Sequence, residues 1–237
     1  MKVEGFEGAK FLYHQDYMRT RVKICCISSI EEAKLAIAHG ADALGLVARM
    51  PSGPGPIADE LIATIAKTIH PPIASFLLTC EQSSSSIIEH IKRTEVNTVQ
   101  IVDELTEGKY EHIRDKLPFV KLVQVIHVTG EESIEQALAV QPFVDTLLLD
   151  SGNPKGAIKT LGGTGNVHNW DISRELVKAV HIPVFLAGGL NPANVRDAIR
   201  KVKPFGVDVC SGVRTNGRLD VNKLSGFINA VHSSPEA

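Results

Sequence analysis

The sequence predicts an α/β fold, a single (β/α)8 barrel of the TIM type over residues 21–237 that follows a short N-terminal extension over residues 1–20. Three observations predict it. Short apolar runs alternate with amphipathic stretches along the chain. Eight such units follow one another without a change in composition. The apolar runs lack a polar face, which is typical of strands in a parallel sheet that is covered on both sides.

The eight expected strands are apolar runs rich in β-branched residues. They lie at residues 21–27, 42–48, 73–79, 97–102, 120–128, 144–150, 182–188 and 206–210.

The stretches between these runs show signals of helices. Residues 28–40 show them most clearly, with serine at the start, acidic residues in the first turn and Gly40 at the end. The pattern assigns no helix between the fourth and fifth strands. The other expected helices lie at residues 58–70, 83–94, 131–141, 171–180, 192–202 and 221–231.

A doubly wound open sheet would show the same alternation, and periodicity alone does not separate the two folds. Eight units in 237 residues without a second domain favour the closed barrel. In such a barrel the loops that follow the strands share one face, and catalytic residues are expected there.

The composition excludes several classes of function. There are 25 basic and 27 acidic residues, with no block of one sign, so nothing indicates a nucleic-acid or membrane partner. No apolar run is long enough to span a bilayer, and residues 1–20 lack the apolar core of a secretory signal. The four cysteines, Cys25, Cys26, Cys80 and Cys210, do not have metal-ligand spacing. A cytoplasmic protein with reduced thiols and no metal is therefore expected.

Several polar residues stand at or just past the expected strand ends. Asp150 ends an apolar run, where an unpaired carboxylate is costly, so it either serves in catalysis or caps a turn. Cys25 is either a small core residue or a reactive thiol. Arg49 either contacts an anion or is solvated, and His127 is best explained as a core histidine held by a backbone carbonyl. Asp103 follows the fourth strand.

Two turns rich in small residues follow the seventh and eighth strands, in "AGGLNPANV" and "CSGVR". An ordinary tight turn with a helix cap would explain either one alone. Two on consecutive units indicate a phosphorylated ligand, because barrels frequently bind phosphate at these loops. The segment "GGTGN", which contains Gly163, is either a third donor loop or a flexible cover. The sequence has no dinucleotide fingerprint, no recognisable Schiff-base lysine and no metal cluster, so no cofactor is expected.

The segments "VKICCIS", "ADALGLV", "LLLDS…GGTG…W", "FLAGGLNPANV" and "GVDVCSGVR" resemble the phosphoribosylanthranilate isomerase family. The resemblance runs from about residue 21 to the end, in the order of the family. It implies a (β/α)8 barrel that catalyses a cofactor-free Amadori rearrangement in tryptophan biosynthesis. The substrate would be N-(5′-phosphoribosyl)anthranilate and the product a 1-deoxyribulose phosphate aminoketose.

The resemblance also implies the roles of individual residues. Cys25 would be the general base and Asp150 the general acid. The substrate phosphate would be bound by backbone groups of Gly188, Gly189, Ser211 and Gly212.

Three further residues are expected to contribute to substrate binding. Lys23 shares its strand face with Cys25 and is the nearest cation that could favour a thiolate. Arg49 could reach the anthranilate carboxylate, and Gly163 lies in the segment expected to close over the substrate.

The chain departs from the family pattern at five places. Cys26 stands where the family has glycine, and Arg214 where it has glutamate. The second loop, "ARMPSGPGPI", lacks the arginine of the family's Ser-Pro-Arg. The fourth strand reads "QIVDE" instead of Gln-Leu-His-Gly, and residues 168–170 read His-Asn-Trp instead of Phe-Asp-Trp. The motif residues for proton transfer and phosphate binding are therefore retained, whereas those that recognise the aromatic acid have changed.

Three hypotheses follow. The first is a phosphoribosylanthranilate isomerase with a divergent anthranilate pocket, and the second is an isomerase of another phosphorylated amino sugar. The third is a catalytically idle barrel that binds a phosphorylated metabolite, against which stands the retention of both Cys25 and Asp150. The sequence leaves open whether the protein is a monomer or a homodimer.

Overall fold

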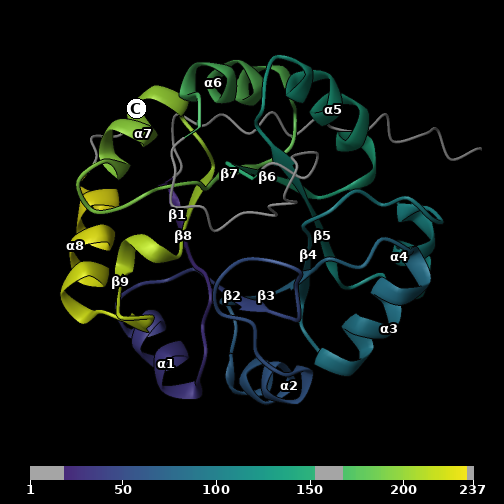
Figure 1. Cartoon of the computed structure of the whole chain (residues 1–237), viewed down its shortest axis with the longest axis horizontal. Coiled ribbons are helices and arrows are strands. Elements are labelled where there is room, and N and C mark those ends of the chain that lie inside the picture. Colours follow the sequence, from purple (N-terminus) through teal and green to yellow (C-terminus); the bar gives the residue numbers. More distant parts are fainter. Residues whose placement is uncertain (1–18, 153–167, 234–237) are drawn as a thin grey trace, which may run out of the picture.

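Eight parallel strands close into a barrel in the computed structural model, which describes residues 19–152 and 168–233 (Figure 1). Each strand pairs with the next one along the chain, and β8 (Gly206–Val209) returns to pair with β1 (Arg21–Ile24). This closure confirms the barrel and excludes the open sheet. The strands between them are β2 (Ala43–Val47), β3 (Ala74–Thr79), β4 (Thr98–Ile101), β5 (Lys121–His127), β6 (Thr146–Asp150) and β7 (Val184–Leu186).

The helices form an outer ring around the strands (Figure 1). At the start of α1 (Ile30–Ala38) the Ser29 side chain accepts a hydrogen bond of 3.2 Å from the N–H of Glu32, so the expected serine cap is present. The other helices are α2 (Asp59–Thr68), α3 (Ser84–Thr94), α4 (Tyr110–Lys116), α5 (Glu132–Val140), α6 (Trp170–Ala179), α7 (Val195–Val202) and α8 (Val221–His232). No helix in the described ranges is long and apolar enough to cross a membrane.

The structure differs from the sequence prediction at two helices. α4 was not predicted, because its seven residues bury one side chain, Ile113, and no side chain caps its first turn. α7 begins at Val195 instead of 192, because the two preceding asparagines close a turn of their own. Asn191 accepts a hydrogen bond from the N–H of Ala193 at 2.9 Å, and Asn194 accepts one from the N–H of Asn191 at 2.8 Å.

A short hairpin follows β8 and is a second element that the sequence analysis missed. It consists of β9 (Arg214–Thr215) and β10 (Arg218–Leu219). Asn216 and Gly217 join the two strands with φ angles of +51° and +78°. Positive φ at both positions is the type I′ turn that an Asn-Gly pair favours, so the signal was present in the sequence. The hairpin brings Arg214 next to α1, where it pairs with Glu32.

Inside the barrel, aromatic rings fill the end opposite the strand carboxyl termini. Phe185 packs edge to face against Phe76 and Phe205, with ring centroids 6.0 and 5.6 Å apart. Gly206 makes this packing fit, because a Cβ at that position would lie 2.4 Å from a ring carbon of Phe185.

Gly206→Ala is expected to lower the free energy of unfolding by about 1–3 kcal/mol, the usual cost of overpacking a core. Gly226→Ala is the matched control in α8, where the new Cβ would lie 3.7 Å from its nearest neighbour. It is expected to raise the free energy by about 0.5–1 kcal/mol, because alanine favours the helix. Urea unfolding followed by circular dichroism measures both changes. Equal stability of Gly206→Ala and the wild type would contradict the close approach to Phe185.

Candidate active site

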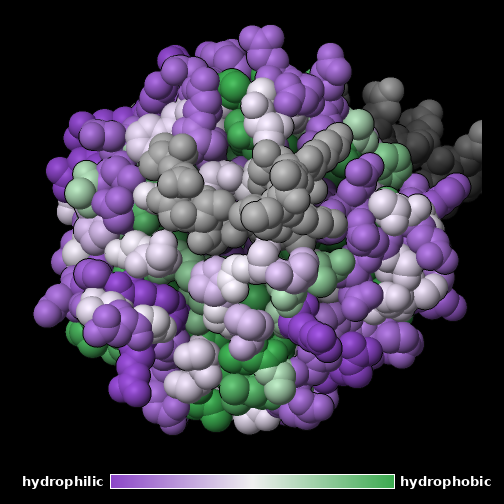
Figure 2. All heavy atoms as spheres, viewed as in Figure 1, coloured by the Kyte–Doolittle hydropathy of each residue, from purple (hydrophilic) through white to green (hydrophobic). Residues whose placement is uncertain are grey.

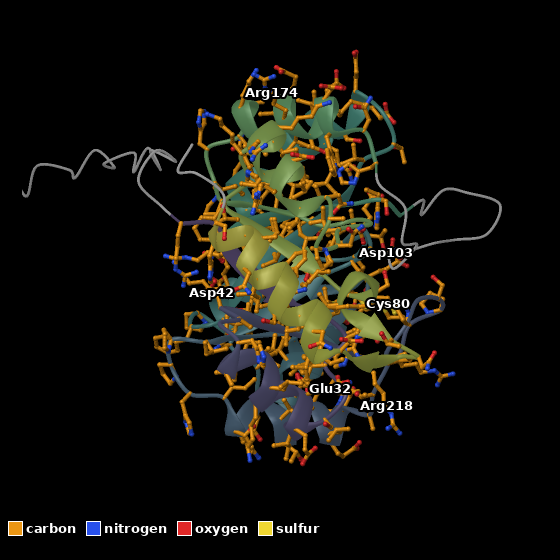
Figure 3. The ribbon with its side chains drawn as sticks, turned by 90° about the vertical axis from the view of Figure 1, so that its left-hand side faces the viewer. Glu32, Asp42, Cys80, Asp103, Arg174 and Arg218 are labelled. Carbon is orange, nitrogen blue, oxygen red and sulfur yellow. The ribbon has the colours of Figure 1, made fainter. Side chains whose placement is uncertain are left out.

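The carboxyl-terminal ends of the strands gather at one face of the barrel. In the side view of Figure 3, Cys80, Asp103 and Arg218, which follow β3, β4 and β8, lie at that end, and Asp42 lies at the other. Figure 2 views this face and shows mostly hydrophilic residues around its rim, a hydrophobic group toward its lower edge, and paler residues nearer its centre. A cavity opens here, and its lining includes five predicted site residues, Cys25, Asp150, Gly188, Gly189 and Ser211. The strand ends therefore converge as the barrel prediction requires.

Cys25 follows the last residue of β1 and is held by backbone bonds. Its N–H donates to the carbonyl oxygen of Val209 at 2.8 Å, so the residue is tied to the end of β8. Its side chain is buried at the cavity wall beside Gly45 of β2. A Cβ at Gly45 would lie 2.7 Å from the Sγ of Cys25 and 3.0 Å from the Nζ of Lys23. The missing side chain of Gly45 thus leaves the space that the thiol and the ammonium group share.

Lys23 is completely buried and pairs with Asp208 of β8, with the Nζ 2.9 Å from the carboxylate. Burial alone would lower the pKa of Lys23, but the negative charges of Asp208 and Cys25 raise it above its ordinary value. The lysine is therefore charged, and its ammonium group and the Cys25 thiol border the same space at Gly45. Because Lys23 is absent from the cavity lining, the geometry gives no support to direct substrate contact.

Asp150 ends β6 opposite His127 of β5 and faces the cavity. Its Oδ1 accepts a hydrogen bond of 2.7 Å from the N–H of Ser151, which is the turn cap considered from the sequence. Burial raises the pKa of Asp150, against the opposing influence of the Ser151 N–H and of His127. A carboxyl group with a raised pKa holds its proton more readily, which suits a general acid. The cap and the catalytic role are compatible because each uses one carboxylate oxygen.

The two turns predicted to bind phosphate lie against each other. Gly188 and Gly189 have φ angles of +82° and +64°, which a residue with a side chain would rarely adopt. Gly212, in the 3-10 turn Ser211–Val213, approaches the seventh loop so closely that a Cβ would lie 2.0 Å from the carbonyl oxygen of Leu190. The N–H groups of Gly188 and Gly189 have no hydrogen-bond partner within the residues that the structure describes. Such N–H groups suit an anion.

His168 borders this turn, where the family pattern has phenylalanine. A Cβ at Gly188 would lie 2.9 Å from its Nδ1, and its Nε2 lies 2.7 Å from the Oγ of Ser173. Burial lowers the pKa of His168 to about 4, so the ring is neutral at pH 7. It is a polar but uncharged neighbour of Gly188.

Some predicted residues lie elsewhere. Arg49 lines a neighbouring depression with Asp59 and Arg93 and is not part of the cavity lining. The Nε2–H of His127 donates to the carbonyl oxygen of Val102, 2.9 Å away, which confirms the core histidine. The Oδ1 of Asp103 accepts a hydrogen bond of 2.9 Å from the N–H of Glu104.

Gly163 lies in residues 153–167, outside the described residues. Most residues of the extension 1–20 lie outside them as well.

Arg214 supports the segment that carries Cys25. Its guanidinium binds both carboxylate oxygens of Glu32 in α1, at 3.1 and 3.0 Å, and donates to the carbonyl oxygens of Cys25 and Cys26. Burial would raise the pKa of Glu32, but Arg214 and the N–H groups of Leu219 and Ser28 lower it. Arg214, which stands where the family has glutamate, thus has a charge partner in Glu32 of α1. The sequence analysis missed this pair.

Asp208 is the other residue that the sequence analysis missed. It interrupts the apolar run "GVDVC" and lines the floor of the cavity. A lone carboxylate in a buried strand was the signal that singled out Asp150, and it applied equally to Asp208.

Comparison with known proteins identifies the family. Residues 22–230 match the model of the N-(5′-phosphoribosyl)anthranilate (PRA) isomerase family. The chain belongs to this family. The PRA isomerase of Methanosarcina acetivorans is 35% identical over 227 residues, covering 90% of this chain and 94% of that protein. That of Methanocella arvoryzae is 33% identical over 213 residues, covering 90% of this chain and 98% of that protein.

Solved structures of PRA isomerases have the same fold. The Thermotoga maritima enzyme matches with a TM-score of 0.74 at 30% identity, covering 90% of this chain and 98% of that one. The Thermus thermophilus enzyme matches with a TM-score of 0.74 at 25% identity, covering 90% and 99%. The resemblance that the sequence motifs indicated is therefore confirmed over the barrel.

Proposed function

We propose that this PRA isomerase family member converts N-(5′-phosphoribosyl)anthranilate into 1-(o-carboxyphenylamino)-1-deoxyribulose 5-phosphate without a cofactor. The observation that carries the proposal is the single cavity that holds Cys25, Asp150 and the two small-residue turns. A related PRA isomerase, with a TM-score of 0.72 at 28% identity, has been solved with a reduced form of this product. An idle barrel would not need an acid and a base at separate strand ends.

The phosphate group would bind at Gly188, Gly189, Ser211 and Gly212, where backbone N–H groups and the start of a 3-10 turn meet. This fixes one end of the ribose at β7 and β8. The sugar would then extend across the cavity between Cys25 on β1 and Asp150 on β6. Binding at four strand ends holds the reacting carbons in one orientation.

The reaction needs one proton donor and one acceptor. Asp150 would protonate the ring oxygen of the furanose, and the C1′–O bond breaks as the nitrogen lone pair forms a protonated Schiff base. The Cys25 thiolate would then remove the proton from C2′, which the adjacent iminium makes acidic, and the electron pair forms an enolamine. Tautomerisation of this intermediate gives the ketone. The charge of Lys23 stabilises the thiolate before the transfer, and the raised pKa of Asp150 keeps its proton available.

Recognition of the anthranilate carboxylate is the step that differs from the family pattern. The second loop offers a serine where the motif supplies an arginine. The Oγ of Ser52 is buried, lines the cavity and has no hydrogen-bond partner in the described part of the chain. We infer that this hydroxyl donates to the carboxylate.

A matched pair of substrates tests the function and this contact together. Freshly prepared N-(5′-phosphoribosyl)anthranilate is expected to turn over, which the loss of anthranilate fluorescence measures, and the aniline analogue without the carboxylate to react more slowly. Ser52→Ala is expected to lower kcat/KM for the anthranilate substrate by about 10–100-fold, since a hydrogen bond to a charged group contributes about 1.5–3 kcal/mol. The rate with the aniline analogue should change little.

The second candidate is an isomerase of a phosphorylated amino sugar that lacks a carboxylate. The position of Arg49 outside the cavity favours it. It predicts the opposite result, a faster reaction with the aniline analogue and no selective effect of Ser52→Ala. No turnover of either compound by folded protein would contradict both candidates.

A further inference from the structure

Two thiols outside the proposed chemistry lie in contact at the rim of the cavity. The Sγ atoms of Cys26 and Cys210 are 2.6 Å apart, which is inside the van der Waals contact of two unbonded sulfur atoms. Both residues stand at the cavity wall, and both are free thiols in this structure. They follow the ends of β1 and β8, whose pairing sets Ile24 against Val209. The closure of the barrel thus brings together two cysteines that are 184 positions apart.

The backbone holds Cys26 in this place. Its φ of +61° lies in the left-handed region, which is uncommon for a residue with a side chain. Arg214 donates to the Cys26 carbonyl oxygen, and the Sγ lies 3.5 Å from the carbonyl oxygen of Pro54. A Cβ at Gly55 would lie 2.7 Å from the Cβ of Cys26, so the second loop packs directly on it. These contacts orient the sulfur toward Cys210 before any bond forms.

The surroundings make one member of the pair nucleophilic. The hydrogen bond with Cys26 lowers the pKa of the Cys210 thiol, Arg214 lowers it further, and burial opposes both. The same hydrogen bond is the main cause that raises the pKa of Cys26, which therefore keeps its proton. Cys210 is also the more exposed of the two residues. A partly exposed thiol with a lowered pKa beside a protonated thiol is the arrangement that undergoes thiol–disulfide exchange.

We propose that Cys26 and Cys210 are a redox-active pair that closes to an intramolecular disulfide and reopens with a thiol reductant. With glutathione disulfide as oxidant, the Cys210 thiolate attacks one of its sulfur atoms, and one glutathione thiolate leaves. The Cys26 sulfur releases its proton to water, attacks the Cys210 sulfur and expels the second glutathione. The two protein thiols give up two electrons and two protons, and the oxidant takes them up as two molecules of glutathione.

Cys25 also lies beside Cys26, and a side-chain hydrogen bond between them is the second cause that raises the pKa of Cys26. The bond is assigned to Cys210 because its Sγ is the one 2.6 Å from the Sγ of Cys26, whereas the Cys25 Sγ also borders Gly45, where the Nζ of Lys23 lies close by. The disulfide would therefore leave the proposed general base as a free thiol. It would also tie the residue after this base to the residue before the phosphate turn at Ser211.

The test uses the whole chain, reduced and then incubated with excess glutathione disulfide under native conditions. After acid quenching, the free thiols are alkylated with N-ethylmaleimide and the protein is analysed by mass spectrometry. The wild type is expected to lose two of its four reactive thiols, to become two hydrogens lighter without added glutathione, and to recover with dithiothreitol. Fragmentation between Cys25 and Cys26 locates the linked sulfur.

Three variants complete the test. Cys80→Ser, whose sulfur lies 3.4 Å from the Arg49 carbonyl oxygen in the neighbouring depression, should form the same bond. Cys26→Gly and Cys210→Ser should form no intramolecular bond. The proposal is overturned if four thiols remain reactive in the folded wild type, if only mixed disulfides with glutathione accumulate, or if the linked peptide contains the sulfur of Cys25 or Cys80.

Discussion

Replacement of Cys25 by serine or of Asp150 by asparagine is expected to lower kcat for N-(5′-phosphoribosyl)anthranilate by about 10²–10⁴-fold, the range over which one general acid or base contributes. A serine hydroxyl is a far weaker base than a thiolate, and an asparagine amide has no acidic proton to give to the ring oxygen. KM is expected to stay within a few-fold, because the phosphate contacts lie on other strands, at Gly188 and Ser211.

Two substitutions of the same kind serve as controls. Cys80→Ser changes a thiol in the neighbouring depression, and Asp103→Asn changes a carboxylate that caps the N–H of Glu104 at 2.9 Å. Neither residue is part of the cavity lining, so both variants are expected to keep kcat within about twofold of the wild type. Circular dichroism shows whether each variant is folded. A Cys25→Ser enzyme that retains more than a tenth of kcat would mean that another group removes the C2′ proton.

The pH dependence separates the acid from the base. Burial raises the pKa of Asp150, so the carboxyl group keeps its proton to a higher pH than an ordinary aspartic acid. The protonated form is the active one, and kcat/KM should therefore fall on the alkaline side as this proton is lost. In Asp150→Asn that alkaline decrease should be missing from the small remaining activity. If the alkaline decrease in kcat/KM persists unchanged in Asp150→Asn, a group other than Asp150 causes it.

The strand order and the place of the site could be predicted because both depend on local patterns. An apolar run that ends in Asp150, and another that ends in two glycines, identify a strand and the residue at its end. Once eight such runs are found, the barrel brings their ends to one face, and Cys25 and Asp150 meet without any knowledge of side-chain directions.

Contacts between distant segments could not be predicted in the same way. The partner of Lys23 is Asp208, 185 positions later, and the pair exists only because β8 closes against β1. The direction of the Arg49 side chain also could not be predicted from the sequence, since a side chain just past a strand end can point toward the barrel axis or toward the helices. Here it turns toward α2 and α3, where Asp59 and Arg93 lie.

Departures from a family motif can be recognised from sequence, but their compensations cannot. The sequence shows that Arg214 replaces the glutamate of the family pattern, and from the sequence alone this reversal of charge is expected to disrupt the site. In the folded chain Glu32 of α1 binds this guanidinium through both oxygens, and the arginine donates to the carbonyl oxygens of Cys25 and Cys26. The compensation depends on the packing of the β9–β10 hairpin against α1.

Lys23→Met is expected to lower the free energy of unfolding at pH 8 by about 3–5 kcal/mol, the cost of leaving one member of a buried ion pair alone. Lys23 is completely buried and Asp208 nearly so, and the second carboxylate oxygen of Asp208 has no other partner among the described residues. Lys178→Met is the matched control, because the Lys178–Glu175 pair has the same kind of contact at 2.8 Å but is exposed. It should change the stability by less than about 0.5–1 kcal/mol. Urea unfolding measures both.

The loss in Lys23→Met should depend on pH in a defined direction. Burial is already the largest influence on Asp208 and raises the pKa of its carboxyl group against the opposing effect of Lys23, so removal of the ammonium group raises this pKa further. A carboxyl group with a higher pKa in the folded than in the unfolded chain binds more protons when folded, so the variant gains stability as the pH falls. Relative to the wild type, Lys23→Met should therefore recover stability between pH 8 and pH 5. A constant difference across this range would show that Asp208 finds another charge partner or water.

The double variant Lys23→Met with Asp208→Val separates the structural role of Lys23 from its role beside Cys25. Removing both charges should recover at least half of the lost stability, since an apolar pair of similar volume often replaces a buried ion pair without loss. The thiolate of Cys25, however, would still lack the cation that borders it at Gly45. The folded double variant is therefore expected to have a kcat at least about tenfold below the wild type. Wild-type kcat in a stable double variant would limit Lys23 to holding β1 against β8.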